Sequence, residues 1–217
     1  MGESDERDPG DNALDSRRPI AARSSALARH AATWLANSGI SPNAISLLSI
    51  VFAIAGAAAL LWMPSPWGPL LCAAGIQARL LCNLFDGMVA VEGGKGSPTG
   101  ALYNEVPDRI ADSAFLIALG YTAGHGWLGW LAALLAAATA YIRTLGGALG
   151  QAQDFRGPMA KQQRMATMTV ACVLAPIELA WSGTRYALLV AGIIIAAGSA
   201  LTCATRLRAI ARRLKPA

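Results

Sequence analysis

Long apolar stretches separated by short turns fill the chain from residue 44 onward. Each is about twenty residues long, the length at which an α-helix crosses the hydrocarbon core of a bilayer. The pattern predicts six membrane-spanning helices, over residues 44–62, 67–90, 101–122, 126–146, 165–182 and 186–205. Two other interpretations stay open, namely buried helices of a soluble protein and five spans with one re-entrant segment.

Composition favours the membrane interpretation. Of the 217 residues, 54% are apolar and only 14% are charged, whereas soluble domains carry about 25% charged residues. The sequence therefore predicts an all-α integral membrane protein. The cysteines all fall in apolar stretches without a C-x2-C pair, which indicates free thiols rather than a zinc site; they are Cys72, Cys82, Cys172 and Cys203.

The N-terminal region has a different character. Residues 1–20 are rich in acidic side chains, and we expect a disordered arm without the apolar core of a secretory signal peptide. Residues 21–38 combine Arg23 and Arg29 with apolar residues such as Trp34. This pattern favours an amphipathic helix lying on the membrane surface, with a poorly ordered linker as the alternative.

Basic residues are distributed unequally between the two sets of turns. The turns near residues 63–69 and 122–126 hold no lysine or arginine, whereas those near 92–99 and 147–164 and the basic tail 206–217 hold several. The positive-inside rule then places both termini in the cytoplasm. We expect the membrane to be a bacterial inner membrane. The net charge of +5 is explained by topology and contact with anionic lipid, without nucleic-acid binding.

A first polar stretch interrupts the second apolar segment near its end. Asn83, Asp86, Gly87 and Ala90 follow the spacing i, i+3, i+4, i+7, so they share one face of a helix. The small residues allow a ligand or a second helix to approach the backbone closely.

A second polar stretch opens the third apolar segment. Gly100, Asn104, Asp108 and Asp112 step by four along another helix face. Carboxylates and amides on two facing helices are oxygen ligands suited to a hard cation that binds a phosphate. Because such groups are costly inside a membrane, they are candidates for the functional site.

Together the two stretches resemble the signature of the CDP-alcohol phosphatidyltransferase family, D-x2-D-G-x2-A-R-x8-G-x3-D-x3-D. Every spacing matches, and the residue types match at five of the eight positions. Asparagine replaces the first and third aspartates, and valine replaces the arginine. The chain reads Asn83-x2-Asp86-Gly87-x2-Ala90-Val91-x8-Gly100-x3-Asn104-x3-Asp108.

The resemblance carries expectations for residues 39–205. It implies six helices around a polar cavity open to the cytoplasm, commonly in a homodimer. It also implies a transferase that moves a phosphatidyl group from CDP-diacylglycerol to a small alcohol and releases CMP. Mg²⁺ or Mn²⁺ is the implied cofactor, because such ions neutralise phosphates and orient a leaving oxygen.

The same resemblance implies roles for the two aspartates that match the motif. Asp86 is implied to bind metal, and Asp108 to lie at the metal site and act as the base that receives the acceptor's proton. The alternative is that either aspartate caps a helix or pairs with Arg109 at the membrane edge.

The two asparagines change this site. Asn83 and Asn104 can ligate a metal through their amide oxygens, but they bring no negative charge. We therefore expect Glu105, with Asp112 as second choice, to restore the missing charge. The alternative is that Glu105 points to the interface and pairs with a nearby lysine or arginine.

Weaker patterns extend the site to the substrates. Residues 41–46 resemble the family's P-N-x-x-T segment, which suggests Asn43 as part of a nucleotide pocket with Gly87, Ala90 and Gly100.

Three basic side chains near the same end are candidates for binding the lipid and acceptor phosphates: Arg143, Lys161 and Arg164. Their alternative role is to set topology. The sequence does not show which group pairs with Arg79, or whether Pro107 kinks the chain to aim Asp108.

Other functions stay open at this point. A transferase of a CDP-choline or CDP-ethanolamine head group would carry the same motif. Asn83, Asn104 and Val91 also motivate a degenerate relative that binds a nucleotide-lipid without turning it over. A transporter is disfavoured, because no charge continues through the later spans.

Overall fold

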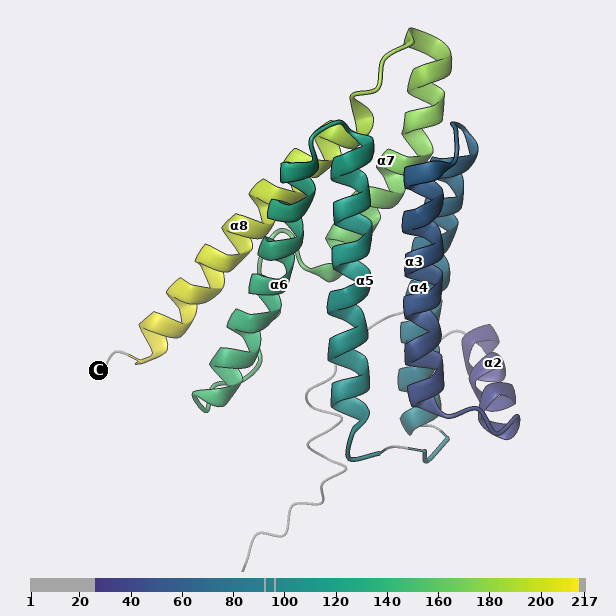
Figure 1. Ribbon diagram of the computed structural model, residues 1–217. Coiled ribbons are helices and arrows are strands. Elements are labelled where there is room, and N and C mark those ends of the chain that lie inside the picture. The colour runs from purple at the N-terminus through teal and green to yellow at the C-terminus, as the bar shows by residue number, and fades with distance from the viewer. Residues whose placement is uncertain (1–25, 92, 96, 215–217) are drawn as a thin grey trace, which may run out of the picture.

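The computed structural model describes residues 26–91, 93–95 and 97–214. These residues form helices without any strand (Figure 1). The helices are α2 (Ala26–Asn37), α3 (Pro42–Trp62), α4 (Trp67–Val91), α5 (Gly100–Thr122), α6 (Gly126–Ala148), α7 (Lys161–Ser182) and α8 (Ala187–Leu214).

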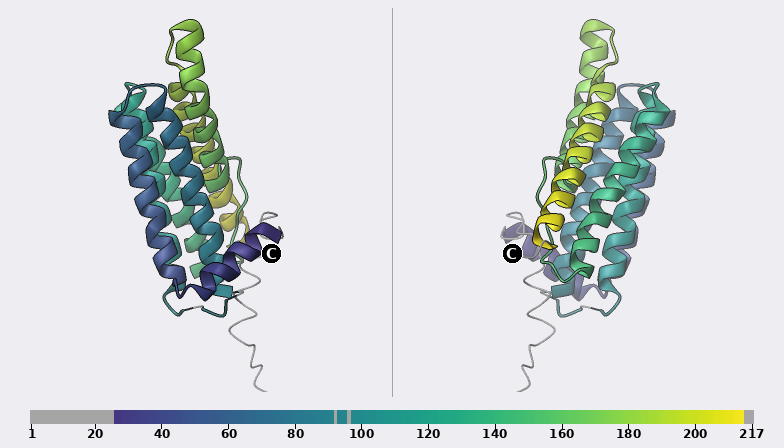
Figure 2. Two further views of the ribbon diagram at one scale, coloured as in Figure 1. Left: turned by 90° about the vertical axis from the view of Figure 1, so that its right-hand side faces the viewer. Right: turned by 90° about the vertical axis from the view of Figure 1, so that its left-hand side faces the viewer.

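The six long helices form a closed ring. Going round it, α3 packs against α4, α4 against α7, α7 against α8, α8 against α6, α6 against α5, and α5 returns to α3. Figure 2 shows this bundle from two sides, with the far end of α7 projecting past its neighbours. Every long helix contributes to one apolar core, with Ala53, Ile76, Phe115, Ala132, Met168 and Ile195 among its fully buried members.

Local chemistry sets several helix boundaries. Ser41 caps α3 by accepting a hydrogen bond from the backbone N–H of Ala44 at 3.2 Å, and Pro42 occupies the first turn. Gly183 ends α7 in the left-handed conformation, with a φ of 70°. The helix α5 runs through Pro107 without interruption.

Five of the helices in the described residues are long and apolar enough to cross a bilayer, namely α3, α4, α6, α7 and α8. Large apolar side chains on the outside of the bundle, such as Leu134 and Trp181, suit lipid contact. The prediction of an all-α integral membrane protein is confirmed. The sixth expected span, α5, has 23 residues but carries four charged side chains between Glu105 and Asp112, and its crossing stays a prediction.

Glycines let neighbouring helices approach closely at two places. A Cβ atom added to Gly75 of α4 would lie 3.0 Å from the Cα of Gly56 in α3, and one added to Gly120 of α5 would lie 2.4 Å from the backbone nitrogen of Gly129 in α6. Such small-residue contacts are a common way to pack helices in membranes.

The short helix α2 covers most of the segment expected to lie on the membrane surface. It packs against α4 and buries Ala32, while Trp34 is exposed. It lies at the end of the bundle where α3 begins and α4 ends (Figure 1). Arg23 and the acidic arm lie outside the described residues.

The segment expected to be a basic tail continues α8 without a break as far as Leu214. Arg206 is buried and holds the loop before α7 in place. Its Nε donates to the carbonyl of Arg156 at 2.9 Å, and its Nη1 donates to the carbonyl of Thr139 in α6 at 2.6 Å. The expected free thiols are confirmed, since all four cysteines are buried and none of them forms a disulfide.

Candidate functional site

The polar stretches meet at one end of the bundle, where α4 ends and both α5 and α7 begin. Asp86 and Asp108 are each 5% exposed, and Asp112 is 1% exposed. Three carboxylates so close to the core need partners, because an unpaired buried charge is strongly destabilising.

Arg79 supplies the central positive charge. It rises from α4 with a fully buried guanidinium, and its Nη2 donates to Asp108 Oδ1 at 3.0 Å and to Asp112 Oδ1 at 2.8 Å. The partner that the sequence left unidentified is therefore a pair of aspartates one turn apart on α5. This arrangement fixes the rotation of α5 against α4.

Asp108 is held from three elements. Besides Arg79, Asn83 of α4 donates its amide Nδ2 hydrogen to Oδ1 at 3.0 Å. Lys161, at the start of α7, contacts Oδ2 with its Nζ, and Arg109 Nη2 lies 3.7 Å from the same oxygen. The pairing with Arg109 that was considered from the sequence is present but is the longest of these contacts.

Asp86 is tied to α3. The hydroxyl of Ser46 donates to Asp86 Oδ2 at 2.6 Å, and Ser46 is itself buried. Ser46 lies in the segment that suggested a nucleotide pocket, but sequence reasoning selected only Asn43 from it. The signal that could have found Ser46 was its place at the last position of the P-N-x-x-T pattern.

Arg164 has a different position from the one expected of a phosphate ligand. It is 1% exposed, and its Nη2 donates to Asp112 Oδ2 at 2.9 Å. Its Nη1 donates to the carbonyl of Met159 at 2.9 Å and to Thr139 Oγ1 at 3.3 Å. These contacts tie α7 to α5 and α6, and they leave Arg164 little freedom to meet a substrate.

A second, more exposed group of charges surrounds the cluster. Arg143 of α6 contacts Glu105 Oε1 and lies over the ring of Phe155, 5.3 Å from its centroid. Glu105 is also 3.7 Å from Arg109, so the alternative in which Glu105 pairs with a nearby basic residue is present. Lys95 instead donates to the carbonyl of Ala36.

The remaining candidates border the same end of the bundle. Asn43 is half-buried in the first turn of α3, Gly87 and Ala90 are half-buried in the last turns of α4, and Gly100 begins α5. Asn104 is exposed, and within the described residues its side chain makes no hydrogen bond. The structure thus brings Asn83, Asp108 and Lys161 into contact. Asp86, one turn after Asn83 on α4, and the other candidates lie around them.

The side-chain oxygens present suit a hard divalent cation, but they carry little negative charge. Asp86 and Asp108 offer carboxylate oxygens, and Asn83 keeps its amide oxygen because its amide nitrogen is the atom bound to Asp108. Among the described residues no three histidine, cysteine or acidic side chains converge on a single point. Carboxylate and amide oxygens are therefore the ligands that this cluster could offer to a cation.

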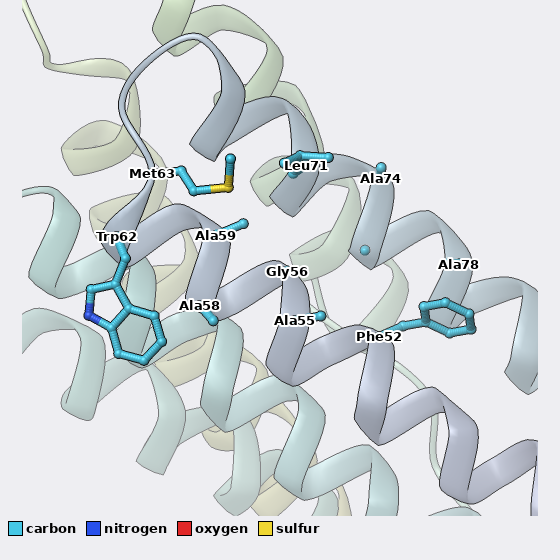
Figure 3. A pocket seen from close by; sticks show the side chains of 11 residues that line it. Phe52, Ala55, Gly56, Ala58, Ala59, Trp62, Met63, Leu71, Ala74 and Ala78 are labelled. Carbon is cyan, nitrogen blue, oxygen red and sulfur yellow. The ribbon is translucent and has the colours of Figure 1, made fainter.

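An apolar groove of about 540 Å³ lies elsewhere on the bundle, between α3 and α4 (Figure 3). Phe52 lines it toward one end, Trp62 and Met63 toward the other, and small residues form much of its wall. It contains no titratable side chain, so it has no chemistry to add to the polar cluster.

Comparison with known proteins bears on both the fold and the site. The family model for CDP-alcohol phosphatidyltransferase matches residues 39–204. A phosphatidylinositol phosphate synthase of Streptomyces avermitilis is 30% identical over 193 residues, covering 83% of this chain and 76% of the relative.

Solved structures agree with the fold. The phosphatidylinositol phosphate synthase of Mycobacterium tuberculosis with CDP-DAG bound aligns with a TM-score of 0.71 at 22% identity, covering 86% of this chain and 94% of that one. The same enzyme in complex with manganese and citrate aligns with a TM-score of 0.70 at 22% identity, covering 84% and 88%. By its motif and by these matches, the chain belongs to the CDP-alcohol phosphatidyltransferase family.

Proposed function

We propose that this protein transfers the phosphatidyl group of CDP-diacylglycerol to a small phosphorylated alcohol and releases CMP. The observation that carries the proposal is the meeting of Asp86, Asp108 and Asn83 at one end of the bundle, in the spacing of the family motif. The relatives named phosphatidylinositol phosphate synthases support a polyol phosphate, such as inositol phosphate, as the acceptor.

The side chains divide the work. Asp86 and Asn83, beside Asp108, would hold a divalent cation, which would neutralise the donor's diphosphate. Asp108 accepts the proton of the acceptor hydroxyl as its oxygen attacks the phosphorus that carries diacylglycerol. The bond from that phosphorus to the oxygen of CMP breaks, and CMP leaves with the bonding electron pair.

The basic side chains around Asp108 suit the acceptor's phosphate. Arg143 is 15% exposed and Lys161 is 24% exposed at the side chain, so both reach solvent at the mouth of the cluster. Arg109 borders the same space. Because Arg164 is buried against Asp112, we assign phosphate binding to Arg143 and Lys161.

The finer features of the architecture belong to the same proposal. We place α5 across the membrane as the sixth span, since it packs against both α3 and α6 and runs between them in the bundle (Figure 1). The basic ends of the helices face the cytoplasm of a bacterial inner membrane by the positive-inside rule. The polar cluster opens there as the substrate cavity, and the protein works as a homodimer.

The test is CMP release from CDP-diacylglycerol by the detergent-purified protein, with Mg²⁺ or Mn²⁺, across inositol phosphate, glycerol 3-phosphate, serine and inositol. We expect metal-dependent release, largest with a phosphorylated acceptor and abolished in Asp108→Asn. Asp154→Asn, which changes an acid on the loop before α7, is the matched control and should keep its activity.

A binding protein without turnover is the second candidate, favoured by the neutral Asn83 and Asn104. It would bind CDP-diacylglycerol and release no CMP with any acceptor or metal. In that case, activity gained by Asn83→Asp with Asn104→Asp would identify a degenerate site.

A further inference from the structure

The charged side chains at the candidate site carry a net positive charge, which disfavours the binding of a cation by the protein alone. Within the described residues the site holds four carboxylates and five basic side chains. The acids are Asp86, Glu105, Asp108 and Asp112, and the bases are Arg79, Arg109, Arg143, Lys161 and Arg164. The sum is one positive charge before any ligand arrives.

The negative charge of Asp108 is already paired with positive side chains of the protein. Arg79 and Asn83 donate to its Oδ1, and Lys161 contacts its Oδ2. A metal ion approaching Asp108 would therefore meet two positive side chains at close range. Like charges a few ångströms apart in a dry site repel strongly.

Asp86 differs from the other three acids. Within the described part of the chain it forms no salt bridge with lysine or arginine, and its carboxylate accepts hydrogen bonds from the neutral hydroxyl of Ser46 and the backbone N–H of Gly87. Asn83, one turn before it on α4, adds an uncharged amide oxygen. This half of the site can bind one divalent cation, and it offers that cation a single full negative charge.

A divalent cation needs more negative charge than one carboxylate provides, because affinity follows the charge of the ligands. The diphosphate of a CDP-linked donor carries the missing charge and suitable oxygen atoms. The donor therefore completes a coordination that the protein leaves unfinished.

We propose that this protein binds one divalent cation per chain, and binds it effectively only together with the diphosphate of its nucleotide donor. The inference rests on the proposed function, since it takes a cytidine diphosphate as the ligand of the same site. The positive groups of Lys161 and Arg79 occupy the position beside Asp108 that a second cation would otherwise take. By linkage, the cation and the nucleotide raise each other's affinity by the same factor.

The experiment measures bound Mn²⁺ by electron paramagnetic resonance on the detergent-purified full chain, with and without CDP as the diphosphate probe. The Mn²⁺–CDP complex without protein supplies the correction for chelation in solution. We expect about one Mn²⁺ per chain with CDP, and an affinity about tenfold or more lower without it.

Two variants locate the effect. Lys161→Met combined with Asn104→Asp adds negative charge near Asp108, and it should bind Mn²⁺ without CDP. Because Asn104 is exposed, this change spares the core.

Asn83→Asp is the second variant and tests the half of the site next to Asp86. Lys95→Met is the matched control, since Lys95 contacts the carbonyl of Ala36 rather than an acid, and it should behave as the wild type.

Two results would overturn the inference, namely two Mn²⁺ ions bound per chain in the absence of CDP, or an Mn²⁺ affinity that CDP does not change. If CMP release from CDP-diacylglycerol is intact in either case, only this inference fails. If neither CDP nor CDP-diacylglycerol binds at all, the proposed function fails with it.

Discussion

Ser46 of α3 and Asp86 of α4 share a buried hydrogen bond, with 2.6 Å between the hydroxyl and carboxylate oxygens. It joins the segment that resembles a nucleotide-binding motif to the one acid of the cluster that forms no salt bridge within the described residues. The bond therefore couples the position of α3 to the carboxylate that we propose as a metal ligand.

Ser46→Ala should lower the rate of CMP release about tenfold, because a buried carboxylate that loses a hydrogen bond is penalised by about 1–3 kcal/mol. The rate of CMP release at saturating Mg²⁺ measures the effect. Ser49→Ala is the control one turn away, where the hydroxyl donates only to the carbonyl of Ser46. Equal rates in the two variants would contradict a special role for Ser46.

Arg79→Met should destabilise the folded protein by about 3–5 kcal/mol, since it leaves Asp108 and Asp112 buried without their shared cation. Thermal unfolding in detergent measures the loss. Adding Asp112→Asn removes one of the stranded charges, so the double variant should be more stable than the additive sum. Arg185→Met, at an exposed position, should unfold as the wild type does.

Arg143 and Arg164 should separate binding from stability. Arg143→Met is expected to raise the KM for the phosphorylated acceptor about tenfold or more, because a charge-assisted hydrogen bond contributes about 1.5–3 kcal/mol. Arg164→Met should instead lower the melting temperature, since its contacts hold α5, α6 and α7 together. An unchanged melting temperature in Arg164→Met would contradict this structural role, and Arg164 would again be a candidate for binding substrate.

Gly120→Ala should destabilise the bundle by about 1–3 kcal/mol, the usual cost of overpacking. The new Cβ would lie 2.4 Å from the backbone nitrogen of Gly129, which has no flexible atom to move aside. Gly147→Ala is the matched control on α6, because nothing lies within 4 Å of the Cβ position there. Denaturation of both variants in mixed micelles compares them directly.

The sequence predicts the helices well and the contacts between them poorly. The expected span 126–146 is the helix Gly126–Ala148, because apolar length alone determines where such a helix lies. The span expected to end at residue 205 continues to Leu214, since hydropathy falls at the membrane edge although the chain stays helical.

The site was only partly predictable for a related reason. The spacing of Asp86 and Asp108 identified their helix faces, but not the rotation of one helix against another. That rotation directs Arg164 toward Asp112 and away from solvent. It also brings together Ser46 and Asp86, which are 40 residues apart, and no local pattern encodes such a contact.

The pairing of Arg79 with Asp108 and Asp112 also constrains how the chain enters the bilayer during synthesis. Alone, α4 would carry an unneutralised arginine into lipid, and α5 would carry unneutralised acids. If α5 crosses the membrane as we propose, the two successive helices would cancel these charges against each other. The ion pair at the proposed site would therefore also make α4 and α5 a single unit of insertion.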